Sequence, residues 1–405
     1  MDTFKASARI INVGDELLKG DTVNTGCAVV ASFLRKKGVK TLKSVVVGDD
    51  REAIFEALSE TKEHWVVLTG GLGPTRDDIT KESVAAFYGI ELVFDERVAR
   101  RVEAIYDAQG SAMPEVCKKL AFVPEGATVL QNEAGTASGF LFEKEGRRIV
   151  LLPGPVPELE SVLAFMDATF EMTTSPHHQG CLLLGIGEAD VETGVERIRE
   201  KHPDVDITLY ASAGEVRCLF VSDDSDALKR VRSTFDEAYG EYIFGGYEDT
   251  AAGVVVAALK ERGMTLALAE SCTGGMIAAK VTAVPGASSV FGSGYVPYAN
   301  AAKEAMLDVD RETLATYGAV SAETVLEMAD GALKKSGADI ALAISGIAGP
   351  TGGTAEKPLG TVFYALAYGH VCETVEKHFS GDRKTIREKA AVFGLTVIAR
   401  SLRDA

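Results

Sequence analysis

The first part of the chain alternates between short apolar runs and longer amphipathic runs. Apolar residues dominate positions 8–14 and 64–71, which predicts buried strands, whereas positions 25–38 and 50–63 carry apolar residues along one helical face. Helices that alternate with short apolar strands are typical of a parallel sheet covered on both faces, and such sheets bind ligands at the carboxyl ends of their strands. We therefore predict an α/β domain over residues 1–170 with a ligand site at that edge.

The pattern changes twice further along the chain. The polar run at 173–180 predicts a linker, and the pattern after it is strand, helix, strand, strand, helix. Two adjacent strands without an intervening helix predict an antiparallel pair, so we expect residues 171–247 to form a small α+β connector domain. Residues 248–405 return to an α/β pattern, with glycine-rich loops directly after the predicted strands at 265–270 and 338–345.

Composition narrows the class of protein and of partner. The chain has 405 residues, too many for one ordinary core, and 59 acidic against 42 basic side chains give a net charge of −17. Nucleic acid is therefore an unfavoured partner, because binding a phosphate backbone requires clustered Lys and Arg. No apolar stretch approaches the roughly 20 residues that span a bilayer, and the start lacks the apolar core of a secretory signal. We expect a cytoplasmic protein with no membrane partner.

The loop after the predicted strand at 265–270 offers a nucleophile. Ser271 opens this loop, and the backbone N–H groups of Thr273, Gly274 and Gly275 are candidates to bind an oxyanion or another anionic group of a substrate. Two other interpretations stay open at this point. Ser271 can serve only as a helix cap, and Cys272 is either a rival nucleophile or a buried thiol.

A serine nucleophile needs a base, and the last domain offers few candidates. His370 and His378 lie far from the glycine-rich loops in the sequence, so a Ser-His-Asp triad has little support. Lys303 is the alternative, since a desolvated lysine can act as a base once its pKa falls. A lysine on a helix is more commonly a solvated charge, however, and the spacing does not decide between the two.

Two further loops are candidate binding sites. Ser345, Gly346 and Gly349 begin a glycine-rich loop that can aim backbone amides at a phosphate or a carboxylate, although it can equally be a long turn. In the first domain, Asp77 and Asp78 follow a glycine-rich loop and suit Mg²⁺ or another divalent cation. The alternative for these two carboxylates is a stabilising position at a helix N-terminus.

Several strings, taken together, resemble one family. INVGDELLKGDTVNT and LTGGLGPTRDDITKESVAAFYG resemble the molybdopterin-binding-like N-terminal domain of the CinA family, and LALAESCTGGMIAAKVTAVPGASSVF and AISGIAGPTGG resemble its C-terminal domain. The region around GIGEADVE resembles a KH-like domain. The resemblance implies two α/β layered domains joined by a small α+β domain, and a homodimer.

For the C-terminal domain, the resemblance implies a nicotinamide mononucleotide deamidase of pyridine nucleotide salvage. Such an enzyme hydrolyses the amide of nicotinamide mononucleotide to nicotinic acid mononucleotide and ammonia without a cofactor. The family's serine nucleophile matches Ser271, its lysine base matches Lys303 and its motif tyrosine matches Tyr298. Arg383 or Arg387, with the glycine-rich loop, is a weaker candidate to hold the substrate phosphate.

For the N-terminal domain, the resemblance implies a metal-dependent pyrophosphatase acting on ADP-ribose, with Asp77 or Asp78 at the metal. This chain departs from the family pattern at Gly26, where a second Asn is usual, at 137–139, where Ala-Ser-Gly replaces Ala-Pro-Gly, and by one inserted residue within 154–160. These departures weaken the pyrophosphatase prediction.

The C-terminal motifs depart once, at Ala299, where Ser is common after the tyrosine. Two alternatives to the deamidase stay open. One is the divalent-metal-dependent ADP-ribose pyrophosphatase as the main activity, and the other is a non-catalytic nucleotide- or pterin-binding regulatory protein.

Overall fold

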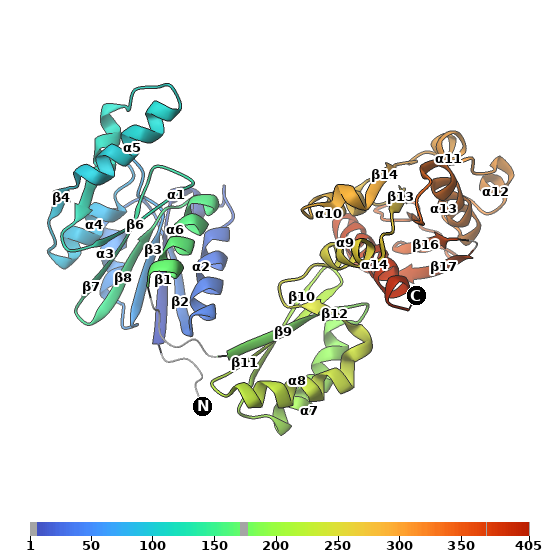
Figure 1. Cartoon of the computed structure of the whole chain (residues 1–405), viewed down its shortest axis with the longest axis horizontal. Coiled ribbons are helices and arrows are strands. Elements are labelled where there is room, and N and C mark those ends of the chain that lie inside the picture. Colours follow the sequence, from blue (N-terminus) through green and yellow to red (C-terminus); the bar gives the residue numbers. More distant parts are fainter. Residues whose placement is uncertain (1–5, 171–176, 370, 405) are drawn as a thin grey trace. The chain divides into compact units, whose positions relative to one another are not determined.

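The computed structural model describes residues 6–170, 177–369 and 371–404, and it divides into two compact units, 1–177 and 178–405 (Figure 1). Each unit has its own sheets and its own hydrophobic clusters. No helix within the described residues is long and apolar enough to cross a membrane.

The first unit is built around a six-stranded sheet with the strand order β2-β1-β3-β8-β7-β6. Its elements are β1 (Ala6–Val13), α1 (Asp15–Lys19), α2 (Thr25–Lys36), β2 (Val39–Val47), α3 (Arg51–Ser59), β3 (Trp65–Thr69), α4 (Thr80–Tyr88), β4 (Leu92–Phe94), α5 (Glu96–Ala108), η1 (Glu115–Ala121), β5 (Phe122–Pro124), β6 (Thr128–Leu130), β7 (Gly139–Lys144), β8 (Arg147–Leu152) and α6 (Val156–Thr169). Side chains of alternate strand residues point to opposite faces. One face packs against α2 and α6, and the other packs against α3, α4 and α5.

The sheet is parallel only in part. Strands β2, β1, β3 and β8 are parallel, whereas β7 pairs antiparallel with β8 and β6 pairs antiparallel with β7. The predicted parallel sheet is thus confirmed for four strands, and the antiparallel edge of β7 and β6 was not predicted. The reason for the antiparallel pairing of β7 with β8 is a two-residue turn at Glu145 and Gly146, both with positive φ, which is the geometry that joins the two strands of a hairpin.

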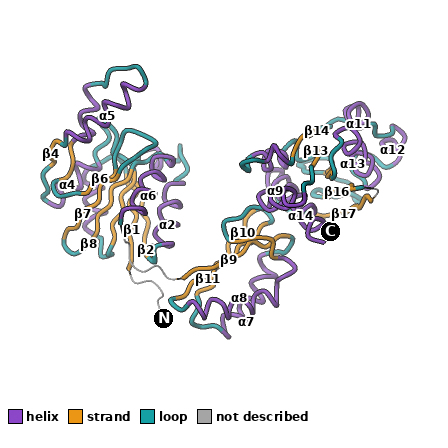
Figure 2. The backbone as a smooth tube through the Cα atoms, viewed as in Figure 1, coloured by secondary structure: helices purple, strands orange, loops and turns teal. Residues whose placement is uncertain are grey.

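The four parallel strands end at the same edge of the sheet, as predicted. The loops that follow Val13, Val47, Thr69 and Leu152 all begin there (Figure 2). The loop after β1, which contains Asp15 and Glu16, and the loop after β3, which contains Asp77 and Asp78, are therefore neighbours because β1 and β3 pair directly.

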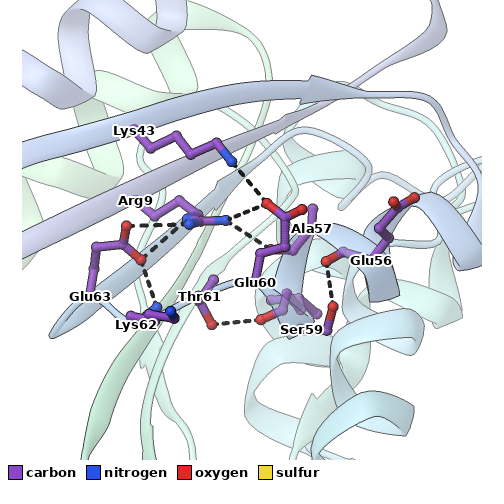
Figure 3. Close-up of polar contacts among 10 residues, drawn as sticks. Arg9, Lys43, Glu56, Ala57, Ser59, Glu60, Thr61, Lys62 and Glu63 are labelled. Carbon is purple, nitrogen blue, oxygen red and sulfur yellow. Dashed lines mark hydrogen bonds and ion pairs between the residues drawn. The ribbon is translucent and has the colours of Figure 1, made fainter.

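Buried charges in this unit are paired. Arg9 of β1 is 6% exposed, and its Nε and NH1 atoms lie 3.2 Å from Glu63 Oε2 and 3.3 Å from Glu60 Oε2 (Figure 3). Lys43 Nζ lies 2.8 Å from the same Glu60 oxygen. This network links β1 and β2 to the connection between α3 and β3, and its carboxylates compensate the cost of burying the guanidinium.

The second unit begins with a four-stranded sheet in the order β10-β11-β9-β12. Its elements are β9 (His177–Leu184), α7 (Glu188–Lys201), β10 (Asp206–Ser212), β11 (Glu215–Ser222), α8 (Ser225–Tyr239), η2 (Gly240–Tyr242) and β12 (Ile243–Gly246). The predicted antiparallel pair is β10 with β11. Strand β12 was not predicted.

The predicted linker at 173–180 is wrong from residue 177 onward, and its first part falls on residues 171–176, which lie outside the described residues. His177, His178, Gln179 and Gly180 form the polar start of β9, where the first three are exposed. A polar strand end has the composition of a loop, so the sequence pattern did not separate the two.

A five-stranded sheet in the order β14-β13-β15-β16-β17 follows. Its elements are α9 (Ala251–Arg262), β13 (Leu266–Glu270), α10 (Met276–Thr282), η3 (Ala287–Ser289), β14 (Phe291–Tyr295), α11 (Asn300–Leu307), α12 (Arg311–Thr316), α13 (Ala322–Ser336), β15 (Ile340–Gly346), β16 (Thr361–Tyr368), β17 (Val371–His378) and α14 (Arg383–Asp404). Helices α9, α10 and α14 cover one face, and α11, α12 and α13 cover the other. Leu182 and Leu184 of β9 belong to the same cluster as α9 and α14, so the two sheets of this unit share a core.

Candidate active site

Strand order brings three segments of the second unit together. Strands β14, β13 and β15 are neighbours and run parallel, so their carboxyl ends, at Tyr295, Glu270 and Gly346, lie at one edge of the sheet. The Ser271 loop therefore lies between the segment that leads to Lys303 and the glycine-rich loop that starts at Gly346.

Ser271 and Lys303 meet at this edge. Lys303 Nζ lies 3.1 Å from Ser271 Oγ, 2.9 Å from the Pro297 carbonyl oxygen and 3.5 Å from the Tyr298 carbonyl oxygen. Lys303 is 1% exposed and Ser271 is 8% exposed. The lysine amine is therefore held out of water within hydrogen-bonding distance of the serine hydroxyl.

The surroundings of Lys303 favour a neutral amine. Burial lowers the pKa of Lys303, and among the described residues no carboxylate lies within ion-pair distance of its amine to offset that burial. A neutral amine has two N–H groups and one lone pair. In that form its two N–H groups can donate to the Pro297 and Tyr298 carbonyl oxygens, and its lone pair is then available for the Ser271 hydroxyl proton.

The interpretation of Ser271 as a helix cap is wrong. The N-cap of α10 is Gly275, and the buried carboxylate of Glu270 accepts hydrogen bonds from the N–H groups of Ile277 and Ala278, at 3.0 and 2.8 Å. Glu270 thus occupies the helix terminus, and the Ser271 side chain is free of that role. Glu270 was not predicted as a site residue, because its only signal in the sequence was its acidic side chain at the end of an apolar strand.

The backbone between Ser271 and α10 requires glycine at two positions. Gly274 and Gly275 have φ of 61° and 88°, a region that residues with a Cβ rarely adopt. The Gly274 N–H already donates to the Ser271 carbonyl oxygen at 3.1 Å. Gly274 is therefore excluded from the predicted set of oxyanion donors in this conformation.

The rival catalytic groups are poorly placed. Burial raises the pKa of Cys272 to about 12, so its thiol stays protonated and is a weak nucleophile. His378 lies on β17, which is separated from β13 by β15 and β16. His370 lies outside the described residues.

Two arginines of α14 hold the loops of the site. Arg387 donates from Nε to the Cys272 carbonyl oxygen at 3.1 Å and from NH2 to the Thr273 carbonyl oxygen at 2.7 Å. Arg383 donates to the Gly349 carbonyl oxygen at 2.7 Å and to the exposed Tyr298 hydroxyl at 2.9 Å. Helix α14, which carries both arginines, was not predicted. Their hydrogen bonds to the loops of the site were therefore not predicted either.

Three other predicted site residues lie on β15 and in the Ser271 loop: Ser345, Gly346 and Thr273. Ser345 is buried, and its hydroxyl donates to the Ala319 carbonyl oxygen at 2.6 Å. Gly346 ends β15 against Thr361 and Val362, with no room for a Cβ. The Thr273 hydroxyl is fully buried and has no hydrogen-bond partner among the described residues.

The N-terminal unit has a separate cavity of about 530 Å³ at the carboxyl edge of its parallel strands. The carboxylates of this lining belong in part to Glu16, Asp77 and Asp78. Asp15 instead forms an ion pair with Lys19, with 2.9 Å between Oδ2 and Nζ. The Thr75 hydroxyl bonds to both aspartates, and this bond lowers the pKa of Asp77. Ionised carboxylates on the wall of a glycine-rich cavity are suited to a cation or to a positively charged group.

Lys119 supports this acidic loop from η1. Its ammonium donates to the carbonyl oxygens of Thr75, at 2.9 Å, and Asp78. Sequence reasoning missed Lys119 because it lies in an unrelated segment. Within the described ranges no group of three or more His, Cys, Asp or Glu side chains is placed to hold a metal ion.

Comparisons with known proteins match two regions of the chain. A family model described as "CinA C-terminal domain" matches residues 248–402, and one described as "Probable molybdopterin binding domain" matches residues 9–168. A "CinA-like protein" from Kosmotoga olearia is 38% identical over 98% of this chain and 98% of its own length, and one from Thermotoga neapolitana is 39% identical with the same coverage.

The chain belongs to the CinA family. Among solved structures, a CinA superfamily protein from Klebsiella pneumoniae is 39% identical, covers 38% of this chain and 97% of its own, and has a TM-score of 0.38.

The departures from the CinA family pattern have identifiable places in the structure. Gly26 and four residues of the segment 154–160 line the N-terminal cavity, whereas Ser138, which replaces the usual Pro, lines a different cavity of the same unit. Ala299 is the N-cap of α11 and provides no side-chain cap to the helix that carries Lys303. The family's usual Ser would supply such a cap.

Proposed function

We propose that the second unit hydrolyses the amide of nicotinamide mononucleotide to nicotinic acid mononucleotide and ammonia. The observation that carries this proposal is the 3.1 Å contact between the buried Lys303 amine and the Ser271 hydroxyl. Membership of the CinA family supports it. The proposed reaction class is acyl transfer through a serine ester, which needs no metal or cofactor.

In the proposed mechanism, Lys303 removes the proton from Ser271 as Oγ attacks the carboxamide carbon. Lys303 then donates this proton to the departing nitrogen, which leaves as ammonia, and a water molecule activated by the same amine cleaves the acyl-enzyme. A lysine can perform both transfers only if its pKa lies near the working pH, which burial without a carboxylate partner promotes.

The developing negative charge on the carboxamide oxygen needs donors near Ser271. We propose the N–H groups of Thr273 and Gly275, because Gly274 is engaged with the Ser271 carbonyl. Arg387 holds the carbonyl oxygens of the same loop, so its role in our mechanism is to position the loop. Arg383 lies between Tyr298 and the glycine-rich loop and is our proposed contact for the substrate phosphate.

The test is ammonia release from nicotinamide mononucleotide by the full chain. We expect activity that EDTA does not remove, that Ser271→Ala abolishes and that Cys272→Ala largely retains. Full activity of Ser271→Ala together with loss in Cys272→Ala would identify the wrong nucleophile. Absence of ammonia release by the wild-type chain would reject the proposal.

A second candidate activity rests on the cavity of about 530 Å³ in the first unit. We propose that this cavity binds ADP-ribose and cleaves its pyrophosphate with a divalent cation. Asp77 and Asp78 fit such an ion, because Mg²⁺ is commonly held by one or two carboxylates together with substrate phosphates. The cation would neutralise charge on the phosphates, while Lys119 and Thr75 keep the two carboxylates in place.

This second activity is tested by AMP production from ADP-ribose across several divalent metals. We expect EDTA and Asp78→Ala each to abolish it and Ser271→Ala to leave it unchanged. A chain that binds these nucleotides but turns over neither substrate would support the regulatory alternative.

A further inference from the structure

A second cavity of about 340 Å³ lies in the first unit and shares no lining residue with the cavity that contains Asp77 and Asp78. Its polar lining comes from α5, from β6 and its flanks, and from the start of β7. The residues that matter are Asp95, Arg97, Arg101, Thr128, Gln131 and Ser138. The volume lies within the range of small-molecule sites.

Arg101 is the charge that makes this cavity unusual. Its guanidinium is partly buried, and its hydrogen bonds go to the carbonyl oxygens of Gly135, at 2.9 Å, and Thr136, at 3.4 Å. Among the described residues no carboxylate lies within ion-pair distance of it, although acidic side chains outnumber basic ones by 59 to 42. Glu133 and Glu158 act on Arg101 only at longer range, and a partly buried guanidinium without a direct ion pair on a cavity wall is suited to an anion.

Ser138 provides an independent sign of a ligand. The residue is 3% exposed, lines the same cavity, and its hydroxyl has no hydrogen-bond partner among the described residues. Buried hydroxyls without a partner are rare because they lose their hydrogen bonds to water. Ser138 stands at the position where the family pattern has Pro, a residue without a hydroxyl.

The other two charges of the cavity neutralise each other. Arg97 donates to both Asp95 oxygens, at 3.2 Å and 2.8 Å, and Asp95 caps α5 through the N–H groups of Arg97 and Val98. Arg101 is therefore the charged side chain of this lining that has no direct ion pair among the described residues.

We propose that this cavity binds the phosphate or carboxylate group of a small metabolite through Arg101 and Ser138. Thr128 and Gln131 supply further polar contacts, and Val98 and Val129 supply an apolar wall for the rest of the molecule. The loop that separates this cavity from the larger one contains Thr136 and Ala137, which line the larger cavity. A ligand bound to Arg101 therefore contacts the rear of a loop whose front faces the proposed pyrophosphatase site.

The test uses inorganic phosphate and acetate as probes on the full chain. Urea unfolding is followed by the fluorescence of Trp65, the only tryptophan, which is buried in β3 of the first unit. A ligand that binds the folded state raises the unfolding midpoint in a saturable way. We expect a smaller rise in Arg101→Gln than in the wild type and a partial reduction in Ser138→Ala.

Arg100→Gln is the matched control, since Arg100 is an exposed neighbour on the same helix, and it should respond to the probes as the wild type does. Comparison with Arg101→Gln removes the general stabilising effect of salts and any binding in the larger cavity. A larger effect of phosphate than of acetate identifies a phosphate site, and the reverse identifies a carboxylate site. Equal responses of the wild type, Arg101→Gln and Ser138→Ala to both probes would overturn the proposal. If Arg101→Gln does not fold, the proposal is tested by the response of Ser138→Ala to the probes, compared with that of the wild type.

Discussion

Two lysines among the described residues are buried, one in each unit, and their surroundings differ. Lys81 on α4 is 2% exposed and Lys303 on α11 is 1% exposed, and burial lowers the pKa of both, to about 8 for Lys81. Lys81 Nζ donates to the Lys119 carbonyl oxygen at 2.9 Å and lies over the Phe140 ring. Lys303 Nζ also has a carbonyl partner, but a serine hydroxyl lies 3.1 Å away.

Both helices also begin without a side-chain cap, at Ile79 and Ala299. Burial, a lowered pKa and a helical position are therefore common to both lysines, and only Lys303 has a nucleophile beside it. The comparison shows that a perturbed lysine is a candidate base only together with the group it would deprotonate.

The two lysines should differ most in the deamidase assay. Lys303→Met should lower kcat by about 10³-fold or more, because it removes the proposed base of both proton transfers. Lys81→Met is the matched control, with the same substitution of a buried lysine in the other unit, and should leave kcat unchanged. Comparable losses in the two variants would show that folding, and not base chemistry, limits the activity.

Substitution of Lys81, unlike that of Lys303, should show its effect in stability, and the effect should be a gain. The folded-state pKa of about 8 lies below the ordinary lysine value of 10.5, so the unfolded state binds more protons between these values and stability rises with pH there. Lys81→Met should remove this slope and raise the free energy of unfolding near neutral pH by about 2 kcal/mol, after loss of one hydrogen bond. Urea unfolding followed by Trp65 fluorescence measures both, and an unchanged slope would contradict the assignment.

Arg387 tests how the nucleophile is positioned. Its planar guanidinium holds two carbonyl oxygens, which a lysine ammonium cannot reproduce with the same geometry. Arg387→Lys should lower kcat about 10- to 100-fold with little change in KM. Arg400→Lys, on the same helix, is the control. A rise in KM for nicotinamide mononucleotide that is absent for the substrate without phosphate would instead make Arg387 a phosphate contact.

The pH profile of the deamidase tests the protonation state of Lys303. Only the neutral amine can accept the Ser271 proton, so kcat should fall about tenfold per pH unit below the pKa of Lys303. Because burial lowers this pKa, the fall should begin below the ordinary lysine value of 10.5. Lys81→Met should have the same profile. A rate independent of pH over that range would argue against lysine as the base.

The smallest expected effect concerns the start of the helix that carries Lys303. Ala299→Ser should supply the missing cap of α11 and raise the free energy of unfolding by about 1 kcal/mol. The position is exposed, so we expect no change in kcat. Circular dichroism during urea unfolding measures the gain, and unchanged stability would show that the N–H groups of α11 are satisfied in another way.

Much of this architecture was predictable because it depends on local pattern. The strands that end at Val13, Thr69 and Glu270 follow from apolar runs bounded by glycine-rich loops. The hairpin at Glu145 was missed although β7 and β8 are as long as the predicted strands, and α14 was missed although it carries Arg383 and Arg387. The resemblance to a family placed the candidate site residues, but it did not indicate Glu270 or Lys119.

The sequence by itself determined the α/β pattern, the glycine positions at Gly274 and Gly275, and the identities of Ser271 and Lys303. Hydrophobic periodicity and turn chemistry are local properties, so they can be read along the chain. Only the tertiary structure decided that β13 lies between β14 and β15, that Lys303 is buried against Ser271 and that Lys81 has no such neighbour. The physical reason is that strand order and burial arise from contacts between residues distant in sequence, and burial is what converts an ordinary lysine into a candidate base.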